Sequence, residues 1–303
     1  MKRLFWLSIA GVVFVLVCTI VWQHGRYADA RLEYVQDYQD LFHGDAFHVL
    51  TFFKVDEDTH LLRDLRTVKR AIGQQQNSQL VYAGKVAYMG LYSKPLNAAL
   101  GEPVAWDAIF LQQFESRQAY DSYLKDPRVR TALDAFPIRF AHGFRRSAST
   151  NLMLPQILLA SKIQRVATLT PSPLPFEDAD PSLGLEFPDI GPPLLAEADN
   201  LGKDAVLIVN LTRTGDAAQQ AADSNYSSNM LGLMADAAHG PLHIGAAEPI
   251  DHPIPFDTAA LVYYPGSRYF RDLIMSTWYQ GIYQDKQLAD TLSIVTVPIT
   301  DHL

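Results

Sequence analysis

The chain has 303 residues, of which 48% are hydrophobic and 19% are charged, and its formal net charge is -8. This composition is typical of a globular protein of two ordinary domains and excludes a disordered chain. The negative charge argues against nucleic acid as a partner, because an acidic surface repels phosphate groups.

The N-terminal segment is apolar. Residues 4–22 contain no charged residue, and the run is about as long as a helix needs to be to cross a bilayer. Lys2 and Arg3 precede it, which favours a cytoplasmic N-terminus. The sequence therefore predicts a transmembrane anchor over residues 1–26, with a cleaved signal peptide as the alternative. In both cases we expect the soluble part to be extracytoplasmic, on the periplasmic side of the cytoplasmic (inner) membrane.

An α+β unit follows the anchor. Residues 27–44 carry apolar side chains at helical spacing and predict a connecting helix. Within residues 45–146, β-branched and aromatic stretches predict strands, and amphipathic stretches predict helices. The predicted strands are residues 48–55, 80–91, 106–114 and 137–144, and the predicted helices are residues 59–74 and 115–124. The order of elements is βαββαβ.

The same order returns after a long connection. Residues 147–200 contain an apolar helical stretch and then a proline-rich segment, 167–193, for which we expect an extended linker. Residues 201–303 predict a second unit. Its strands are expected at residues 205–211, 242–250, 256–264 and 292–298, and its helices within residues 217–238 and 269–279.

The two units align with each other. When Trp106 and Asp107 are placed over Phe256 and Asp257, the same offset pairs Leu111 with Leu261, Phe114 with Tyr264 and Tyr120 with Phe270. Identity between the units is low, but the pattern is consistent and indicates an internal repeat.

Several short motifs in both units resemble the DUF1330-like branch of the dimeric α/β barrel superfamily. They are Trp106-Asp107, Phe114-Glu115-Ser116, Ala119-Tyr120 and Asp126-Pro127 in the first unit, and Tyr264-Pro265-Gly266-Ser267, Tyr269-Phe270 and the stretch 276–280 in the second. The resemblance implies an α+β fold in which two ferredoxin-like βαββαβ repeats face each other. One chain would then form a pseudodimeric α/β barrel.

Four residues are candidates for catalysis. His142 and His243 lie on predicted strands, where an imidazole could move protons or bind haem iron; a half-exposed structural histidine is the alternative. Asp107 and Asp257 occupy matching positions and could serve acid/base chemistry if the repeats brought them together. The alternative is a structural role in binding turn amides. The spacing of the histidines and acidic residues is not that of a zinc site, so we expect no metal site.

Five further residues are candidates for binding a ligand between the repeats. They are Lys54, Tyr82, Tyr88, Arg139 and Tyr263, and the alternative for the tyrosines is ordinary core packing. We expect a membrane-anchored barrel of undetermined activity that binds a small, partly apolar ligand. An oxidoreductase, either monooxygenase-like or haem-associated, is the alternative, and a protein-interaction module is a third. The cofactor is left unassigned, and association with further copies of the chain stays open.

Overall fold

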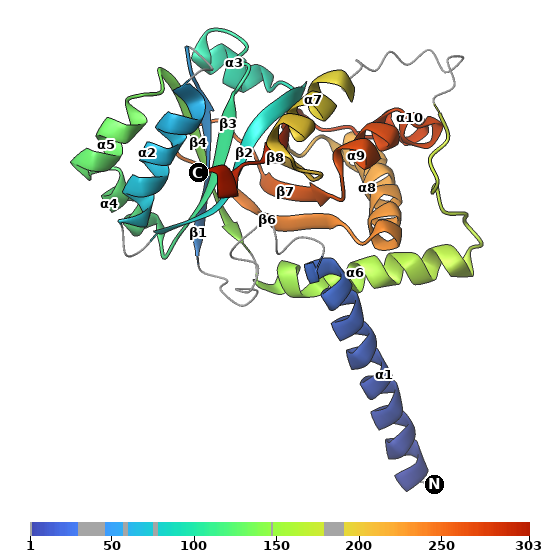
Figure 1. The fold of residues 1–303 in the computed structure, drawn as a ribbon. Helices are drawn as coiled ribbons and strands as arrows, with labels where there is room; N and C mark the ends of the chain where they lie inside the picture. Colours follow the sequence, from blue (N-terminus) through green and yellow to red (C-terminus); the bar gives the residue numbers. More distant parts are fainter. Residues whose placement is uncertain (1, 30–45, 57–59, 75–77, 147, 179–190) are drawn as a thin grey trace.

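The computed structural model describes residues 2–29, 46–56, 60–74, 78–146, 148–178 and 191–303. The predicted connecting helix over residues 27–44 lies largely outside these ranges. The mixed α+β architecture that the sequence predicts is confirmed: the strands form one closed barrel with helices packed around it (Figure 1).

The first half of the barrel has the predicted βαββαβ order, with an added helix between its two middle strands. Its strands are β1 (Phe47–Lys54), β2 (Ser78–Leu91), β3 (Ala108–Phe114) and β4 (Ile138–Arg146). Its helices are α2 (Leu61–Gly73), α3 (Lys94–Leu100), α4 (Arg117–Tyr123) and α5 (Pro127–Leu133). Side-chain oxygens of Ser93, Ser116 and Asp126 accept N-terminal amide hydrogens and so begin α3, α4 and α5.

The second half has the same βαββαβ order, without a helix between its two middle strands. Its strands are β5 (Val206–Arg213), β6 (Gly240–Pro249), β7 (Thr258–Tyr264) and β8 (Asp290–Pro298), and its helices are α8 (Ala217–Ala237), α9 (Ser267–Ile274) and α10 (Thr277–Tyr283). A short 3-10 turn, Thr300–His302, ends the chain. The single helix predicted near residues 269–279 is in fact two, because Ser276 caps a new helix by accepting a hydrogen bond from the Tyr279 amide.

All neighbouring strands of the barrel pair antiparallel, in the order β1-β3-β2-β8-β5-β7-β6-β4. Each half contributes four adjacent strands in the same arrangement. The seams between the halves are β2 with β8 and β4 with β6. The two seams are equivalent, since each joins the second strand of one repeat to the fourth strand of the other. The pseudodimeric barrel is therefore built within one chain.

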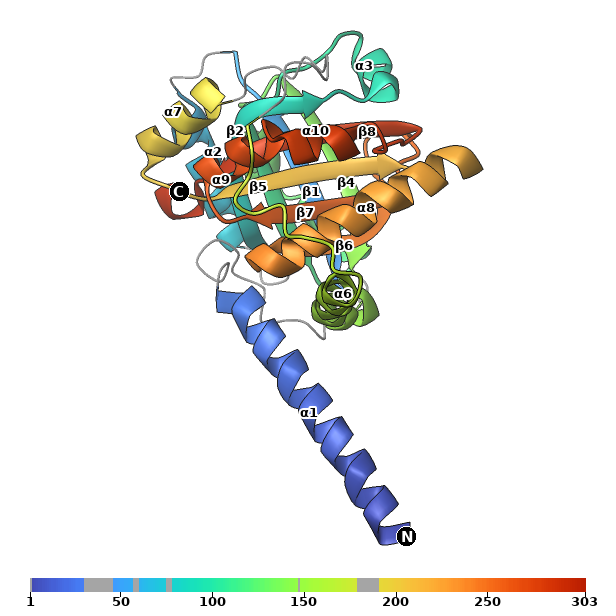
Figure 2. The ribbon, with the colours of Figure 1, turned by 90° about the vertical axis from the view of Figure 1, so that its right-hand side faces the viewer.

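Alternation along the strands divides the apolar residues into three cores. Alternate residues of all eight strands, among them Leu50, Phe140, Leu207 and Ile294, fill the inside of the barrel. A second core lies between the outer face of the first half and helices α2, α4 and α5. The third lies between the outer face of the second half and helices α8, α9 and α10, which cross that face in Figure 2.

The remaining helices lie outside the repeats. Helix α1 (Lys2–Asp29) projects away from the barrel, and α6 (Ala148–Ala167) lies across its base (Figures 1 and 2). The transmembrane anchor predicted over residues 1–26 stays a prediction: counted over the described residues alone, no helix is long and apolar enough to cross a membrane.

The expectation of a linker without regular structure over residues 167–193 is wrong at its end. Helix α7 (Gly191–Leu201) begins there. Pro192 and Pro193 fall in its first turn, where a helix has no use for the missing amide hydrogen. Residues 179–190 of the linker lie outside the described ranges.

Candidate functional site

The two matched aspartates tie strands together within their own halves. Asp107 precedes β3, forms an ion pair of 3.1 Å with Lys54 and accepts a hydrogen bond of 2.8 Å from the Val55 amide. Asp257 precedes β7 and accepts a 2.6 Å hydrogen bond from the Thr214 amide. Both carboxylates therefore hold the end of the first strand of their repeat, which also accounts for the predicted ligand-binding residue Lys54.

The two candidate histidines lie inside the barrel. His142 on β4 and His243 on β6 are both fully buried. The ring of His142 packs edge-on against Phe256, and the ring of His243 lies 5.4 Å from that of His48. Burial lowers the pKa of His142 to about 4, so its imidazole is neutral near pH 7.

The other predicted ligand-binding residues are dispersed. Tyr82 and Tyr263 belong to the buried barrel interior, and the Tyr82 hydroxyl is 2.7 Å from that of Thr296. Arg139 donates a hydrogen bond to the Leu133 carbonyl at the end of α5. Between the repeats, where a ligand was expected, buried side chains of all eight strands pack together, Tyr82 and Tyr263 among them. Tyr88 alone of the five lines the cavity described next.

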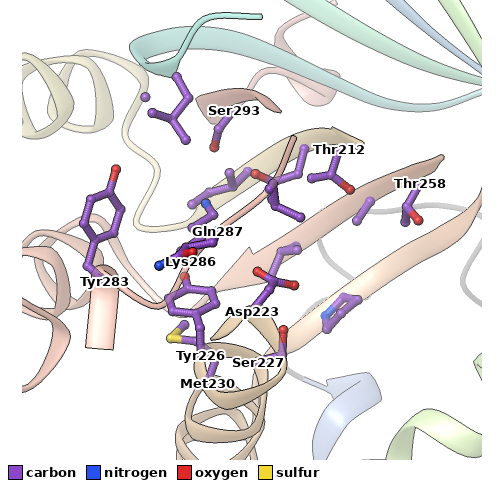
Figure 3. Close-up of a pocket in the computed structure, with 18 of the residues that line it drawn as sticks. Thr212, Asp223, Tyr226, Ser227, Met230, Thr258, Tyr283, Lys286, Gln287 and Ser293 are labelled. Atoms are coloured by element: carbon purple, nitrogen blue, oxygen red, sulfur yellow. The ribbon is translucent and has the colours of Figure 1, made fainter. Parts of the chain in front are cut away.

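A cavity of about 510 Å³ lies on the outside of the barrel, between the second half of the sheet and helix α8. Helices α9 and α10, the loop after α10, and the end of β2 complete its wall. Figure 3 shows side chains of α8, including Asp223, Tyr226 and Ser227, reaching toward Thr212, Thr258 and Ser293 on the strands.

The cavity has an apolar end. On the sheet it is lined there by Ile208 on β5 and by its direct register partners, Val262 on β7 and Val295 on β8. Buried methionine and aromatic side chains from the helices and β7 close this end: Met230, Met234, Tyr264 and Phe270. Such a lining suits a ring or a branched hydrocarbon.

The opposite end is polar. Two residues after Ile208 on β5, Asn210 pairs with Ser293 on β8. Two residues further on, Thr212 pairs with Thr258 on β7. The polar part of α8 faces them with Asp223 and Ser227, and the loop after α10 adds Lys286 and Gln287 (Figure 3). Along the cavity, helix α8 and the strands that face it therefore both change from apolar to polar side chains in the same direction.

Two ionisable groups at the polar end are only partly solvated. Burial lowers the pKa of the Lys286 ammonium group, with the Asp223 carboxylate acting in the opposite direction. Burial raises the pKa of Asp223, and here Lys286 opposes the shift. The Lys286 nitrogen also lies 5.8 Å from the centre of the Tyr226 ring. Both shifts have the direction that partial loss of solvent produces.

The helix over the cavity explains why space remains there. Asp216 and Gln219 form a capping box that begins α8, and Ala238 in the left-handed conformation ends it. The buried residues of α8 all fall in its last two turns, between Met230 and Ala235. By contrast α2, its counterpart in the first half, buries apolar residues along its whole length.

The strands beneath these two helices also differ, since those of the first half carry larger apolar side chains than those of the second. The register pairs Phe53 with Ala108 and Thr51 with Phe110, and it pairs Thr212 with Thr258 and Asn210 with Ala260. Phe53 and Phe110 therefore correspond to Thr212 and Ala260. In the first half the two phenyl rings meet edge to face at 5.1 Å under α2. In the second half both rings are absent, and the cavity occupies their place.

Most of this site was missed by the sequence interpretation. Residues such as Asn210, Asp223 and Lys286 belong to no recognised pattern. The usable signal was the composition of α8, whose first half is rich in alanine and polar residues instead of amphipathic. Among the residues that the structure describes, no group of histidine, cysteine and acidic side chains is arranged to hold a metal ion.

The comparisons with known proteins find solved structures of low similarity to this chain. No protein family and no curated protein matches the chain. Among solved structures, an anthrone oxidase-like protein matches with 7% identity and a TM-score of 0.43, over 84% of this chain and 91% of its own. An arginine-to-alanine variant of chlorite dismutase from Candidatus Nitrospira defluvii matches with 10% identity and a TM-score of 0.43, over 88% and 97%. A candidate monooxygenase from Lactobacillus acidophilus matches with 10% identity and a TM-score of 0.40, over 84% and 95%. At these values the comparisons assign neither the DUF1330-like branch nor an activity to this chain.

Proposed function

We propose that the protein binds a small, partly apolar ligand in the cavity between α8 and the outer face of the second half of the barrel. The observation that carries this proposal is the replacement of Phe53 and Phe110 by Thr212 and Ala260 at equivalent positions. It leaves about 510 Å³ of space in one repeat where the other is packed.

The energetic argument supports a ligand. Interiors are normally close-packed, and a void forfeits the contacts that its walls would otherwise make. Removing a buried phenyl ring typically costs about 3–5 kcal/mol of stability. A molecule bound in the cavity would restore such contacts. The cavity also combines an apolar wall with a few polar groups, which is the usual composition of small-molecule sites.

A cavity-filling variant tests the proposal. The probe is 1-anilinonaphthalene-8-sulfonate, whose fluorescence rises when it enters an apolar site. Ala260→Phe places a ring in the cavity, and we expect it to abolish the fluorescence that the wild-type chain produces. Ala221→Phe makes the same chemical change on the exposed face of α8 and is expected to leave the fluorescence unchanged. Equal fluorescence of wild type and Ala260→Phe would contradict the proposal.

The alternative of an oxidoreductase that uses His142 or His243 is not adopted. Both imidazoles lie inside the barrel, and no histidine or cysteine is among the described residues that line the cavity. The residues present therefore do not fit a haem held in this cavity by either histidine.

We also propose that α1 attaches the protein to the cytoplasmic membrane, with the barrel on the extracytoplasmic side. The uncharged run of residues 4–22 after Lys2 and Arg3 supports this, as do exposed apolar side chains of α1 such as Val12, Phe14 and Trp22. We expect the full chain to resist extraction with alkaline carbonate and the barrel to be digested by protease in intact spheroplasts. Recovery in the soluble fraction, or protection from the protease, would refute the corresponding part of this proposal.

A further inference from the structure

We propose that the ligand of this cavity is an amphiphile: an aromatic body fills the apolar end, and a hydrogen-bond donor on its head group binds the side-chain oxygen of Asn210. This inference rests on the function proposed above and adds the chemical class and the orientation of the ligand.

The orientation follows from the gradient of polarity along the cavity. At the apolar end, Met230, Met234 and Phe270 offer no hydrogen bond, so a polar head group placed there would lose its hydration without compensation. At the other end the sheet presents Asn210, Thr212, Thr258 and Ser293. A ligand with one apolar and one polar end fits in only one direction.

The aromatic character follows from the wall. Tyr226 and Tyr279 come together in an edge-to-face contact with ring centres 6.4 Å apart, and Tyr264 and Phe270 do so at 4.9 Å. All four rings line the cavity. Rings arranged in this way present both edges and faces to a flat aromatic guest, and methionine sulfur adapts to its outline.

The donor is assigned from Asn210. Its side-chain oxygen Oδ1 is buried and has no hydrogen-bond partner among the described residues. Of its two register partners, Ala260 on β7 has no polar side chain, and Ser293 on β8 forms no hydrogen bond with this oxygen. Buried acceptors in native proteins almost always have a partner, so this oxygen marks the place where a hydroxyl or N–H group of the ligand belongs. Asp223 and Lys286 are partly exposed, and water can satisfy them.

A pair of matched probes tests this assignment. 2-Naphthol carries a hydroxyl donor, whereas 2-methoxynaphthalene has the same ring system and no donor. Dissociation constants are measured by calorimetry on the full chain in mild detergent, after subtraction of titrations into detergent alone. We expect wild type to bind 2-naphthol about tenfold more tightly, as one well-formed hydrogen bond implies.

Variants of Asn210 locate the effect. In Asn210→Leu the preference for 2-naphthol is expected to fall below about twofold, whereas Asn210→Asp keeps an acceptor and is expected to keep the preference. Asn210→Val, which suits a strand, repeats the test should the leucine variant fold poorly. Asn225→Leu removes an exposed amide from the same region of α8 and is expected to change nothing.

The outcomes separate this inference from the function on which it rests. If wild type binds both naphthalenes with equal affinity and Ala260→Phe binds neither, the donor assignment is overturned and the cavity stays the binding site. A preference that survives in Asn210→Leu would also overturn it. Failure of both compounds to bind would overturn the inference and the proposed site together.

Discussion

Filling the cavity should stabilise the protein, and the size of the gain can be worked out from the first half of the barrel. Ala260→Phe returns to the second half the ring that Phe110 supplies in the first. Fully burying a phenylalanine side chain contributes about 1.5–3 kcal/mol. Some of this is offset by the lost rotamer freedom of the ring and by imperfect fit, so a net gain of about 0.5–2 kcal/mol is expected.

The double variant Thr212→Phe with Ala260→Phe should gain more. It recreates the edge-to-face pair that Phe53 and Phe110 form at 5.1 Å, and such a pair contributes roughly a further 0.5–1.5 kcal/mol. Two added rings still have to fit into about 510 Å³, which is ample for both.

The assay is thermal unfolding followed by circular dichroism, with urea unfolding as an independent measure. For a domain of this size each kcal/mol shifts Tm by about 2 °C, so we expect Ala260→Phe to raise Tm by roughly 1–4 °C. Ala221→Phe on the exposed face is expected to leave Tm unchanged within about 1 °C. A fall in Tm for Ala260→Phe comparable to that of a core disruption would show that the two halves are not equivalent here and would refute the reasoning.

Three further predictions concern the described packing. Phe110→Ala should open a void under α2 and lower the free energy of unfolding by about 3–5 kcal/mol in urea titrations, and a loss below 1 kcal/mol would contradict the packing described. His142 has a pKa of about 4 in the fold against 6.5 when exposed, so the unfolded chain binds the proton first and stability is lost as pH falls from 6.5 toward 4. In parallel urea titrations at pH 7 and pH 4.5, we expect wild type to lose about 2 kcal/mol more of its free energy of unfolding than His142→Leu does. Equal losses in the two proteins would show that burial does not lower the pKa of His142. Asp107→Ala should lower the free energy of unfolding by about 1–3 kcal/mol, because the ion pair with Lys54 and the hydrogen bond from the Val55 amide are lost. It should leave the fluorescence of bound anilinonaphthalene sulfonate unchanged. Lost fluorescence in a folded variant would mean that this carboxylate acts on the cavity.

The fold was accessible from the sequence because its signals are local. Nearly continuous apolar and aromatic runs such as residues 48–55 and 256–264 mark strands with two buried faces, and the constant offset between Asp107 and Asp257 marks the repeat. The matching aspartates also show a limit of such reasoning: their recurrence favours a structural role without excluding catalysis, and the hydrogen bonds to Val55 and Thr214 show what they hold.

The cavity was not accessible in the same way, because it is a difference between two surfaces. Thr212 and Ala260 are ordinary strand residues when each is considered alone. Their meaning appears once the register places them where Phe53 and Phe110 stand in the other half. The helix boundary near Ser276 was missed for a different reason, since a serine inside a helical pattern becomes a cap only if its backbone leaves the helical conformation.

The seams of the barrel set the order in which the molecule can be completed during synthesis. Tyr82 and Thr296, which meet across the seam between β2 and β8, are 214 positions apart in the chain. Until β8 leaves the ribosome, β2 has an unpaired edge beside an exposed apolar face, and such edges invite pairing with other chains. Contacts of such long range also slow folding. The nascent protein is thus most prone to aggregate just before β8 is complete, and a variant that lacks β8 would leave that edge open permanently.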